Sequence, residues 1–275
     1  MERKKLIFLD IDGTLTPAGS NVPPRSAQNA VRAARENGHK VFLCTGRNPA
    51  MLAPVLAYGF DGAVSLAGGY IFCGSEVIYD CPMTELQRDT ALTLLHREGV
   101  FCTLEARDAT YGDESLDSFL SAAPAGNSEI ERWRRALAED LGILPMSQYD
   151  GRPAYKVVFM CTDARQLAPA KAALEQEFLF CAQQVEAHGC LNGELINRAF
   201  DKGRGVLRVC SRLGFSAEDT IGFGDSMNDL EMIETVGFGV CMENGSDALK
   251  ARSDLICPSV EQDGLASAFA QLGLI

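Results

Sequence analysis

The 275-residue sequence has no long uninterrupted hydrophobic run. Its longest apolar stretches, such as MLAPVLAYGF at 51–60, are short and broken by Pro and Gly, so the sequence predicts no membrane span. The first residues, MERKK, are basic, but a strand and an acidic pair follow where a secretory signal needs an apolar core and a cleavage site. We therefore expect a cytoplasmic protein.

Positive charge is also scarce. The 25 Lys and Arg residues stand against 37 Asp and Glu, which gives a formal net charge of −12. Nucleic acids and anionic membrane surfaces are bound by basic surfaces, so the composition disfavours both as partners. A small anionic substrate is not excluded, because a local cluster of donors or a metal ion can outweigh the global charge.

The ten cysteines include no C-x-x-C pair, the spacing of many zinc and redox sites. Most lie in apolar surroundings, such as VFLCTG and FGVCME, which favours buried free thiols. A zinc site or a disulfide framework is the alternative interpretation.

Strands and helices are predicted to alternate near the N-terminus. Residues 5–10 are typical of a buried strand, 26–37 of an amphipathic helix with Ser26 as its N-cap, and 40–44 of a second strand. The same alternation returns after the segment HGCLNGELIN. Short connections between such elements favour right-handed βαβ units and a parallel sheet.

Between these two regions the pattern changes. From 83 to about 188 the sequence predicts a different mixture of helices and strands, two of the helices near 115–122 and 128–141. With 47% hydrophobic residues, the chain is long enough for two compact domains. We expect an α/β fold in which 1–81 and 189–275 form one sheet domain and 82–188 form an inserted α/β domain.

Four short motifs lie at expected strand ends or at the start of a helix. They are DIDGT at 10–14, TGR at 45–47, DKG at 201–203 and GDSMND at 224–229. In open α/β sheets, ligands bind outside the carboxyl ends of the strands, so the four motifs are expected to meet.

Asp10 and Asp12 are two residues apart at the end of a strand, so their side chains point to the same side. Two adjacent carboxylates repel each other, and a hard divalent cation such as Mg²⁺ would cancel this repulsion. Gly13 allows the backbone to turn tightly around a ligand. An ordinary D-G turn after a polar strand end is the alternative.

The last motif strengthens the metal hypothesis. Asp225 ends the strand predicted at 220–224 and would supply a third carboxylate beside Asp10, with Asn228 and Asp229 close behind. On its own, this motif is also typical of a capped helix start with acidic residues near the N-terminus.

Two motifs suit an anion. Thr45 and Gly46 open a turn after a strand, where a hydroxyl and free backbone N–H groups can hold a phosphate, although an ordinary turn has the same appearance. Lys202 opens a helix, an unfavourable place for a cation. By default it is a surface lysine, but beside a phosphate it would offset charge that develops during transfer.

Together and in this order, the motifs resemble those of the haloacid dehalogenase-like hydrolase superfamily, and more narrowly its Cof-type sugar-phosphatase subfamily. The resemblance also includes CTGR at 44–47, VCMENGSDALKARSDLI at 240–256 and EQDGLASAF at 261–269. It covers roughly 1–80 and 190–275. It implies a Rossmann-like, doubly wound parallel sheet core with an inserted α/β cap that selects the substrate.

The resemblance also implies a reaction, the Mg²⁺-dependent hydrolysis of small phosphate esters such as sugar phosphates or cofactor-like phosphates. Asp10 would be the nucleophile that forms an aspartyl-phosphate, and Asp12 the general acid and then the base. Asp10, the carbonyl oxygen of Asp12, and Asp225 would hold Mg²⁺. The substrate phosphate would be bound by Thr45, Gly46, Lys202 and Asn228, with Asp229 orienting Lys202.

An Asp at position 12 favours esters, whose leaving alkoxide needs a proton, and disfavours dehalogenation, which needs none. A phosphomutase for hexose phosphates is the alternative with the same chemistry. A non-catalytic phosphate sensor is disfavoured because Asp10, Asp12 and Lys202 are all present. Hinges are expected near Cys81–Pro82 and His188–Gly189, and the polar candidates for substrate selection are Arg107, Tyr111, Arg152, Tyr155 and His188.

Overall fold

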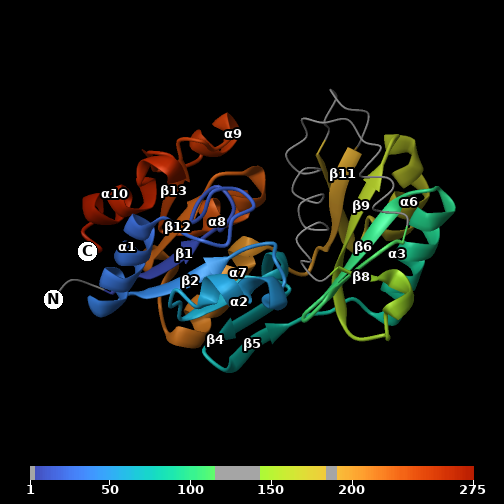
Figure 1. The fold of residues 1–275 in the computed structure, drawn as a ribbon, viewed down its shortest axis with the longest axis horizontal. Coiled ribbons are helices and arrows are strands. Elements are labelled where there is room, and N and C mark those ends of the chain that lie inside the picture. The colour runs from blue at the N-terminus through green and yellow to red at the C-terminus, as the bar shows by residue number, and fades with distance from the viewer. Residues whose placement is uncertain (1–3, 115–142, 184–190) are drawn as a thin grey trace. The chain divides into compact units, whose positions relative to one another are not determined.

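Figure 1 shows the computed structural model, which describes residues 4–114, 143–183 and 191–275. The chain divides into two compact units. The first comprises Met1–Asp80 with Phe200–Ile275, and the second comprises Cys81–Ala199. Each unit combines one sheet with helices.

The first unit contains an eight-stranded sheet with the order β14-β13-β12-β1-β2-β3-β4-β5. Its strands are β1 (Leu6–Leu9), β2 (Lys40–Cys44), β3 (Gly62–Ser65), β4 (Tyr70–Cys73), β5 (Glu76–Asp80), β12 (Thr220–Gly224), β13 (Phe238–Met242) and β14 (Leu255–Cys257). The strands from β14 to β3 run parallel, and β4 and β5 add an antiparallel edge. The predicted parallel sheet, built from both ends of the chain, is confirmed.

The strand order reverses direction at β1, which lies between β2 and β12. Such a switch point is where open α/β sheets bind their ligands. The helices of this unit are α1 (Arg25–Glu36), α2 (Pro49–Leu56), α7 (Lys202–Leu213), α8 (Leu230–Thr235), α9 (Asp247–Lys250) and α10 (Gly264–Gln271).

Helices cover both faces of this sheet (Figure 1). Side chains alternate along a strand, so alternate residues of β1 enter two different cores. Ile7 and Leu9 pack in one cluster with residues of α1 and α10, and Phe8 packs in the other with residues of α7 and α8. The sheet is therefore doubly wound, as expected. One detail of the prediction is wrong: Pro24, not Ser26, precedes the first turn of α1, because a proline's restricted φ suits a helix start.

The second unit contains a six-stranded sheet with the order β10-β11-β9-β6-β7-β8. Its strands are β6 (Phe101–Ala106), β7 (Thr110–Gly112), β8 (Ile143–Pro145), β9 (Ala154–Cys161), β10 (Phe178–Gln183) and β11 (Leu191–Asn197). The pairing is antiparallel except between β7 and β8. Its described helices are α3 (Glu85–Arg97) and α6 (Ala168–Leu174), whose buried residues join one face of the sheet in a single core.

The second boundary of this unit differs from the sequence-based one. The sequence places it after His188, whereas the second unit continues to Ala199. The reason is β11, which pairs along its length with β9 and β10 and so belongs to the second sheet. The helices expected near 115–122 and 128–141, and the hinge expected at His188–Gly189, lie outside the described residues.

The nine cysteines within the described ranges are all free thiols, and six of them are buried. For these six, the structure agrees with the interpretation as small buried hydrophobes, and the nine form no disulfide with one another. Within the same ranges, no helix is long and apolar enough to cross a membrane.

Candidate active site

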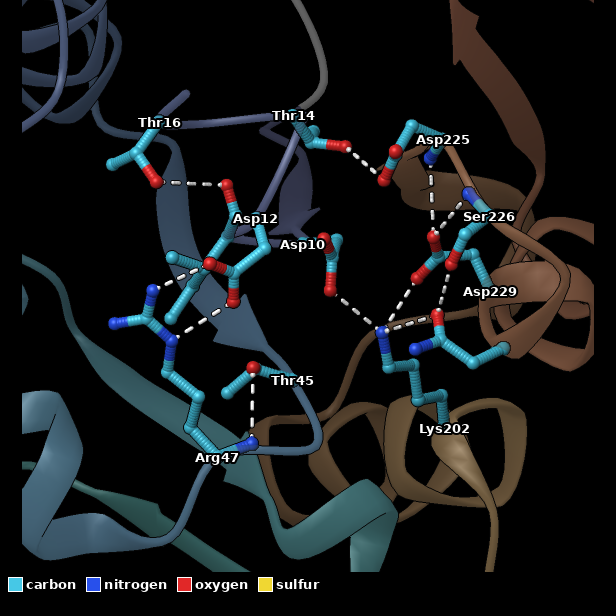
Figure 2. Close-up of polar contacts among 12 residues, drawn as sticks. Asp10, Asp12, Thr14, Thr16, Thr45, Arg47, Lys202, Asp225, Ser226 and Asp229 are labelled. Carbon is cyan, nitrogen blue, oxygen red and sulfur yellow. Dashed lines mark hydrogen bonds and ion pairs between the residues drawn. The ribbon is translucent and has the colours of Figure 1, made fainter. Parts of the chain in front are cut away.

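The four motifs meet at one edge of the first sheet. Asp10 follows β1, Thr45 follows β2 and Asp225 follows β12, and these three strands are neighbours that run parallel. The backbone N–H of Asp10 still donates to the carbonyl of Phe223 on β12. Figure 2 shows Lys202 pointing toward the side chain of Asp10.

Lys202 lies at the centre of a buried polar network and is only 2% exposed. Its Nζ lies 2.7 Å from Oδ1 of Asp10, 2.6 Å from Oδ1 of Asp229 and 3.2 Å from Oδ1 of Asn228 (Figure 2). Burial disfavours the ammonium ion, but the carboxylates of Asp10 and Asp229 outweigh this effect and hold the pKa of Lys202 well above its usual value.

The start of α7 explains how a lysine reaches this position. The side chain of Asp201 caps the helix by accepting a hydrogen bond from the backbone N–H of Arg204, at 2.6 Å. At Gly203, a Cβ would lie 2.3 Å from the carbonyl oxygen of Glu231, so only glycine lets α7 approach α8 this closely. The acidic residue beside Lys202 is therefore a helix cap.

Three carboxylates lie around this lysine. Asp10, Asp225 and Asp229 each place one oxygen within 4.8 Å of the other two. Burial, and then the charge of Asp229, raise the pKa of Asp10 well above its usual range. The same two causes raise the pKa of Asp225 to about 7. One ammonium ion cannot balance three carboxylates, so the site fits a divalent cation.

Beside this cluster, the loop of Gly13 and Thr14 contacts the loop of Asp225. Gly13 has a φ of +86°, and a Cβ there would lie 2.4 Å from Oδ2 of Asp225. The hydroxyl of Thr14 donates to Oδ1 of Asp225 at 3.3 Å, and the amide of Asn244 donates to the carbonyl of Gly13 at 2.9 Å. Ser246 adds a backbone hydrogen bond to the carbonyl of Asp225 at 2.9 Å. The segment from 240 to 256 thus holds the acidic loops in place.

Asp12 has a different partner, Arg47. Nε of Arg47 lies 2.9 Å from Oδ2 of Asp12, and Nη2 lies 2.6 Å from Oδ1, a bidentate ion pair (Figure 2). The same guanidinium donates to the side chain of Asn21 at 2.6 Å and to the carbonyl of Ser20 at 3.2 Å. Arg47 belongs to the TGR motif, but the sequence gives it no assigned role. Its signal was a cation two residues beyond Thr45, in the turn that follows β2, the strand beside β1.

Thr45 is buried, and its backbone N–H donates to the carbonyl of Val64 at 2.8 Å. This amide is therefore committed to the sheet and cannot bind an anion. The hydroxyl of Thr45 accepts a hydrogen bond from the backbone N–H of Arg47 at 3.2 Å and keeps its own proton for another acceptor. Of the donors expected at this turn, the Thr45 hydroxyl and the Gly46 amide stay candidates.

Comparison with known proteins decides the family. Residues 7–269 match the family described as haloacid dehalogenase-like hydrolase. The chain belongs to this family. The resemblance carried by the four motifs, including its Cof-type branch, is confirmed.

Relatives of this hydrolase cover nearly its whole length. It is 31% identical to YkrA of Bacillus subtilis, with 98% of each chain covered. It is 27% identical to YwtE of B. subtilis, named a 5-amino-6-(5-phospho-D-ribitylamino)uracil phosphatase, again over 98% of each chain. It is 23% identical to YbhA of Escherichia coli, named a pyridoxal phosphate phosphatase, over 95% of this chain and 96% of YbhA.

Solved structures share the fold of this hydrolase. A protein of Geobacillus kaustophilus HTA426 has a TM-score of 0.82 at 24% identity, covering 99% of this chain and 100% of its own. The sugar phosphatase BT4131, of subclass IIB of the superfamily, has a TM-score of 0.78 at 21% identity over the same shares. These likenesses confirm the fold class, a parallel α/β core with an inserted α/β cap.

Within the second unit of this hydrolase, three of the polar residues suggested for substrate selection are buried or form contacts with other residues of the unit. Tyr111 is 1% exposed and packs edge-on against Tyr149, with ring centroids 5.1 Å apart. Arg152 forms ion pairs with Asp108 at 3.1 Å and Asp150 at 2.7 Å. Tyr155 is likewise buried, and His188 lies outside the described residues.

Proposed function

We propose that this protein is a Mg²⁺-dependent phosphatase that hydrolyses small phosphate esters through an aspartyl-phosphate on Asp10. One observation carries the proposal: Asp10 ends the central strand of the sheet, with Lys202 bonded to its Oδ1 and a second, half-buried carboxylate, Asp225, beside it. A nucleophile, a cation for the phosphate and a place for a metal are thus within reach of one another.

The donor set suits Mg²⁺, which prefers oxygen ligands and usually takes one or two carboxylates. Asp10, Asp225 and the carbonyl oxygen of Asp12 would hold the ion. Asp229 suits this role less, because its Oδ1 accepts from Lys202 while its Oδ2 accepts from the backbone N–H groups of Asp225 and Ser226, both at 3.1 Å. When bound, Mg²⁺ would offset the charge that keeps a phosphate away from carboxylates.

The protein's own residues would then act in two steps. In the first, a carboxylate oxygen of Asp10 bonds to phosphorus, the ester P–O bond breaks, and Asp12 donates a proton to the leaving oxygen. In the second, water attacks the same phosphorus, Asp12 takes a proton from it, and the bond to Asp10 breaks, which releases phosphate. Acid–base help of this kind typically contributes about 10²–10⁴ in rate.

The remaining motif residues would bind the phosphoryl oxygens. Lys202 supplies a positive charge, while the Thr45 hydroxyl, the Gly46 amide and the Asn228 side chain supply hydrogen bonds. Thr45 and Lys202 are buried, so these two groups would meet the transferring group with little reorganisation. Asp229 would keep Lys202 charged and oriented.

Arg47 would position Asp12. Its guanidinium holds both carboxylate oxygens and so fixes the orientation of the Asp12 side chain. This orientation serves the second step, in which Asp12 takes a proton from water. We therefore assign Arg47 to the hydrolysis of the aspartyl-phosphate.

The substrate class rests on the relatives. Two of them are named as phosphatases of a phosphorylated cofactor and of a ribityl phosphate, and a structural neighbour as a sugar phosphatase. We propose substrates of similar size, selected by the second unit, Cys81–Ala199. The cytoplasmic location expected from the sequence stays a prediction.

Phosphate release tests the proposal. The full chain with Mg²⁺ is expected to release phosphate from a generic aryl phosphate and from members of a panel of several dozen esters, and EDTA to abolish turnover. Asp10→Asn is expected to lose nearly all activity, whereas Asp89→Asn, at a side chain 61% exposed in a surface pair with Arg88, serves as the matched control. Beryllofluoride, which mimics an aspartyl-phosphate, is expected to inhibit.

Three outcomes would contradict parts of the proposal. Activity that persists in Asp10→Asn would refute the covalent step. Conversion of a hexose 1-phosphate to the 6-phosphate, dependent on a bisphosphate and without phosphate release, would identify a phosphomutase. Ester binding without any turnover would identify a sensor.

A further inference from the structure

A second group of metal-type ligands lies within the second unit. His96, Cys102 and Asp113 each place one donor atom within 4.8 Å of the other two. They come from three elements: His96 lies in the last turn of α3, Cys102 on β6, and Asp113 directly after β7. Among the residues that the structure describes, this is the one such group that contains histidine or cysteine.

The donor distances suit a tetrahedral ion. Nε2 of His96 lies 3.0 Å from both carboxylate oxygens of Asp113. With Zn–N and Zn–O bonds of about 2.0–2.2 Å, two ligands of a tetrahedral zinc ion lie about 3.3 Å apart. The thiol of Cys102 lies within 4.8 Å of these donors. Its hydrogen-bond contact with the carbonyl of Val100, at 3.8 Å, is weak, so the ligands can adjust by a few tenths of an ångström around an ion.

The carboxylate of Asp113 is also held in place by the backbone. Oδ2 of Asp113 accepts a hydrogen bond from the backbone N–H of Cys102 at 2.8 Å. The pairing of Thr103 with Gly112 fixes the two strands from which these residues come. Backbone contacts of this kind orient metal ligands and are typical of metal sites.

The charges also suit zinc. One thiolate, one carboxylate and a neutral imidazole would balance Zn²⁺. Sulfur and nitrogen donors select zinc over Mg²⁺, so this site would not compete for the ion proposed at Asp10.

The site is also accessible. A cavity of about 490 Å³ is lined by residues that include His96, Asp113, Glu114 and Met146. The His96 side chain is 39% exposed. A metal ion can therefore reach the imidazole and the carboxylate from solvent, while the thiol closes the inner side.

We propose that His96, Cys102 and Asp113 form a Zn²⁺ site with water in the fourth position. The ion would tie the end of α3 to the hairpin of β6 and β7 and so stabilise the second unit. Zinc binding would exchange the thiol proton of Cys102, and any proton on His96, for the metal.

Cobalt and zinc titrations of the EDTA-treated full chain test this site. Co²⁺ is expected to produce a thiolate-to-cobalt charge-transfer absorption, which Zn²⁺ then removes. Cys102→Ser and His96→Gln are each expected to lose this absorption and to raise the zinc dissociation constant at least about tenfold, measured against a chromogenic chelator. Zn²⁺ is expected to raise the Tm of the wild type but not of His96→Gln.

Two control variants locate the signal. Cys181→Ser removes an exposed cysteine on β10, and Asp225→Asn alters the proposed magnesium site; both are expected to keep the cobalt absorption. His96→Gln decides the matter if Cys102→Ser fails to fold, because the His96 side chain is partly exposed. Absence of the absorption in the wild type, or its persistence in His96→Gln, would overturn the proposal, and neither result bears on phosphatase activity.

Discussion

Lys202 and Asp229 form an ion pair with 2.6 Å between Nζ and Oδ1, and their side chains are only 2% and 0% exposed. A buried pair is tolerated only when further groups satisfy its charges. Here Asp10 is a second partner of the ammonium ion, and two backbone N–H groups bind the other oxygen of Asp229. The pair therefore keeps a permanent positive charge beside the predicted nucleophile.

Asp229→Asn is expected to lower kcat by about 10²-fold or more, because Lys202 loses the partner that orients it. Breaking a buried pair in this way typically costs about 3–5 kcal/mol, so the free energy of unfolding is expected to fall as well. Steady-state kinetics and urea unfolding measure both effects. Glu234→Gln, which alters a surface pair with Arg252, is the control and should change neither. An Asp229→Asn enzyme with unchanged kcat would show that the orientation of Lys202 does not matter.

Arg47→Met is expected to lower kcat for an aryl phosphate more than kcat/KM. The aryl group leaves without a proton, so the first step needs Asp12 little, whereas the second step needs it as a base. A burst of released aryl alcohol should therefore appear in rapid-mixing kinetics. Arg47→Lys, which keeps the charge but not the fork, should fall between wild type and Arg47→Met. An equal loss in kcat and kcat/KM would instead indicate that Arg47 contacts the transferring phosphate.

The metal-free protein is expected to lose stability as pH rises toward 7. Burial and Asp229 raise the pKa of Asp225 to about 7 in the folded state, against about 3.9 for an unfolded chain. Between these values the folded state binds a proton that the unfolded state releases, so the free energy of unfolding falls with increasing pH. Below the lower value the contribution is fully present, and above the upper one it is lost.

Urea unfolding in EDTA from pH 5 to pH 7.5 measures this dependence. Mg²⁺ should stabilise the protein more at pH 7.5 than at pH 5, because at low pH it must displace the proton of Asp225. Asp225→Asn should flatten the dependence and weaken the effect of Mg²⁺. A stability that rises over this range in EDTA would contradict the assignment.

Gly13→Ala is expected to weaken Mg²⁺ binding as well as stability. The residue has a φ of +86°, and the added Cβ would lie 2.4 Å from Oδ2 of Asp225, so the carboxylate must move. Gly151→Ala is a matched control, because Gly151 has a φ of +84° with nothing within 4 Å of the added Cβ. Both variants should lose stability through backbone strain, but only Gly13→Ala should raise the Mg²⁺ concentration needed for half-maximal activity. An equal Mg²⁺ requirement in the two would contradict the role of Gly13.

Much of the fold was predictable because its signals are local. The strands before Asp10 and Asp225 are short, mostly apolar runs, and each run stops at a carboxylate. This change from apolar to charged residues indicates the end of a buried strand. The boundary of the second unit was harder. The strand Leu191–Asn197 carries no motif of its own, and its membership in the second sheet depends on pairing with β9 and β10.

The predicted site residues were found from strand ends, turns and a family resemblance, which also paired Asp229 with Lys202. The partner of Asp12 was not predicted. Arg47 and Asp12 are separated by 35 residues in the chain, and no local pattern shows that their side chains form a bidentate pair. The same holds for Thr45, whose amide is taken by a carbonyl of the neighbouring strand.

By itself, the sequence determined the alternating elements, the family and the polar residues at the strand ends, because periodicity and motifs are properties of neighbouring residues. The tertiary structure alone decided which of these groups meet. It placed Lys202 against Asp10 across 192 residues, joined Arg47 to Asp12, and brought His96, Cys102 and Asp113 together. Such contacts depend on how strands pair and helices pack over long separations in the sequence. This packing decides which side chains are buried and which charged groups lie close enough to interact.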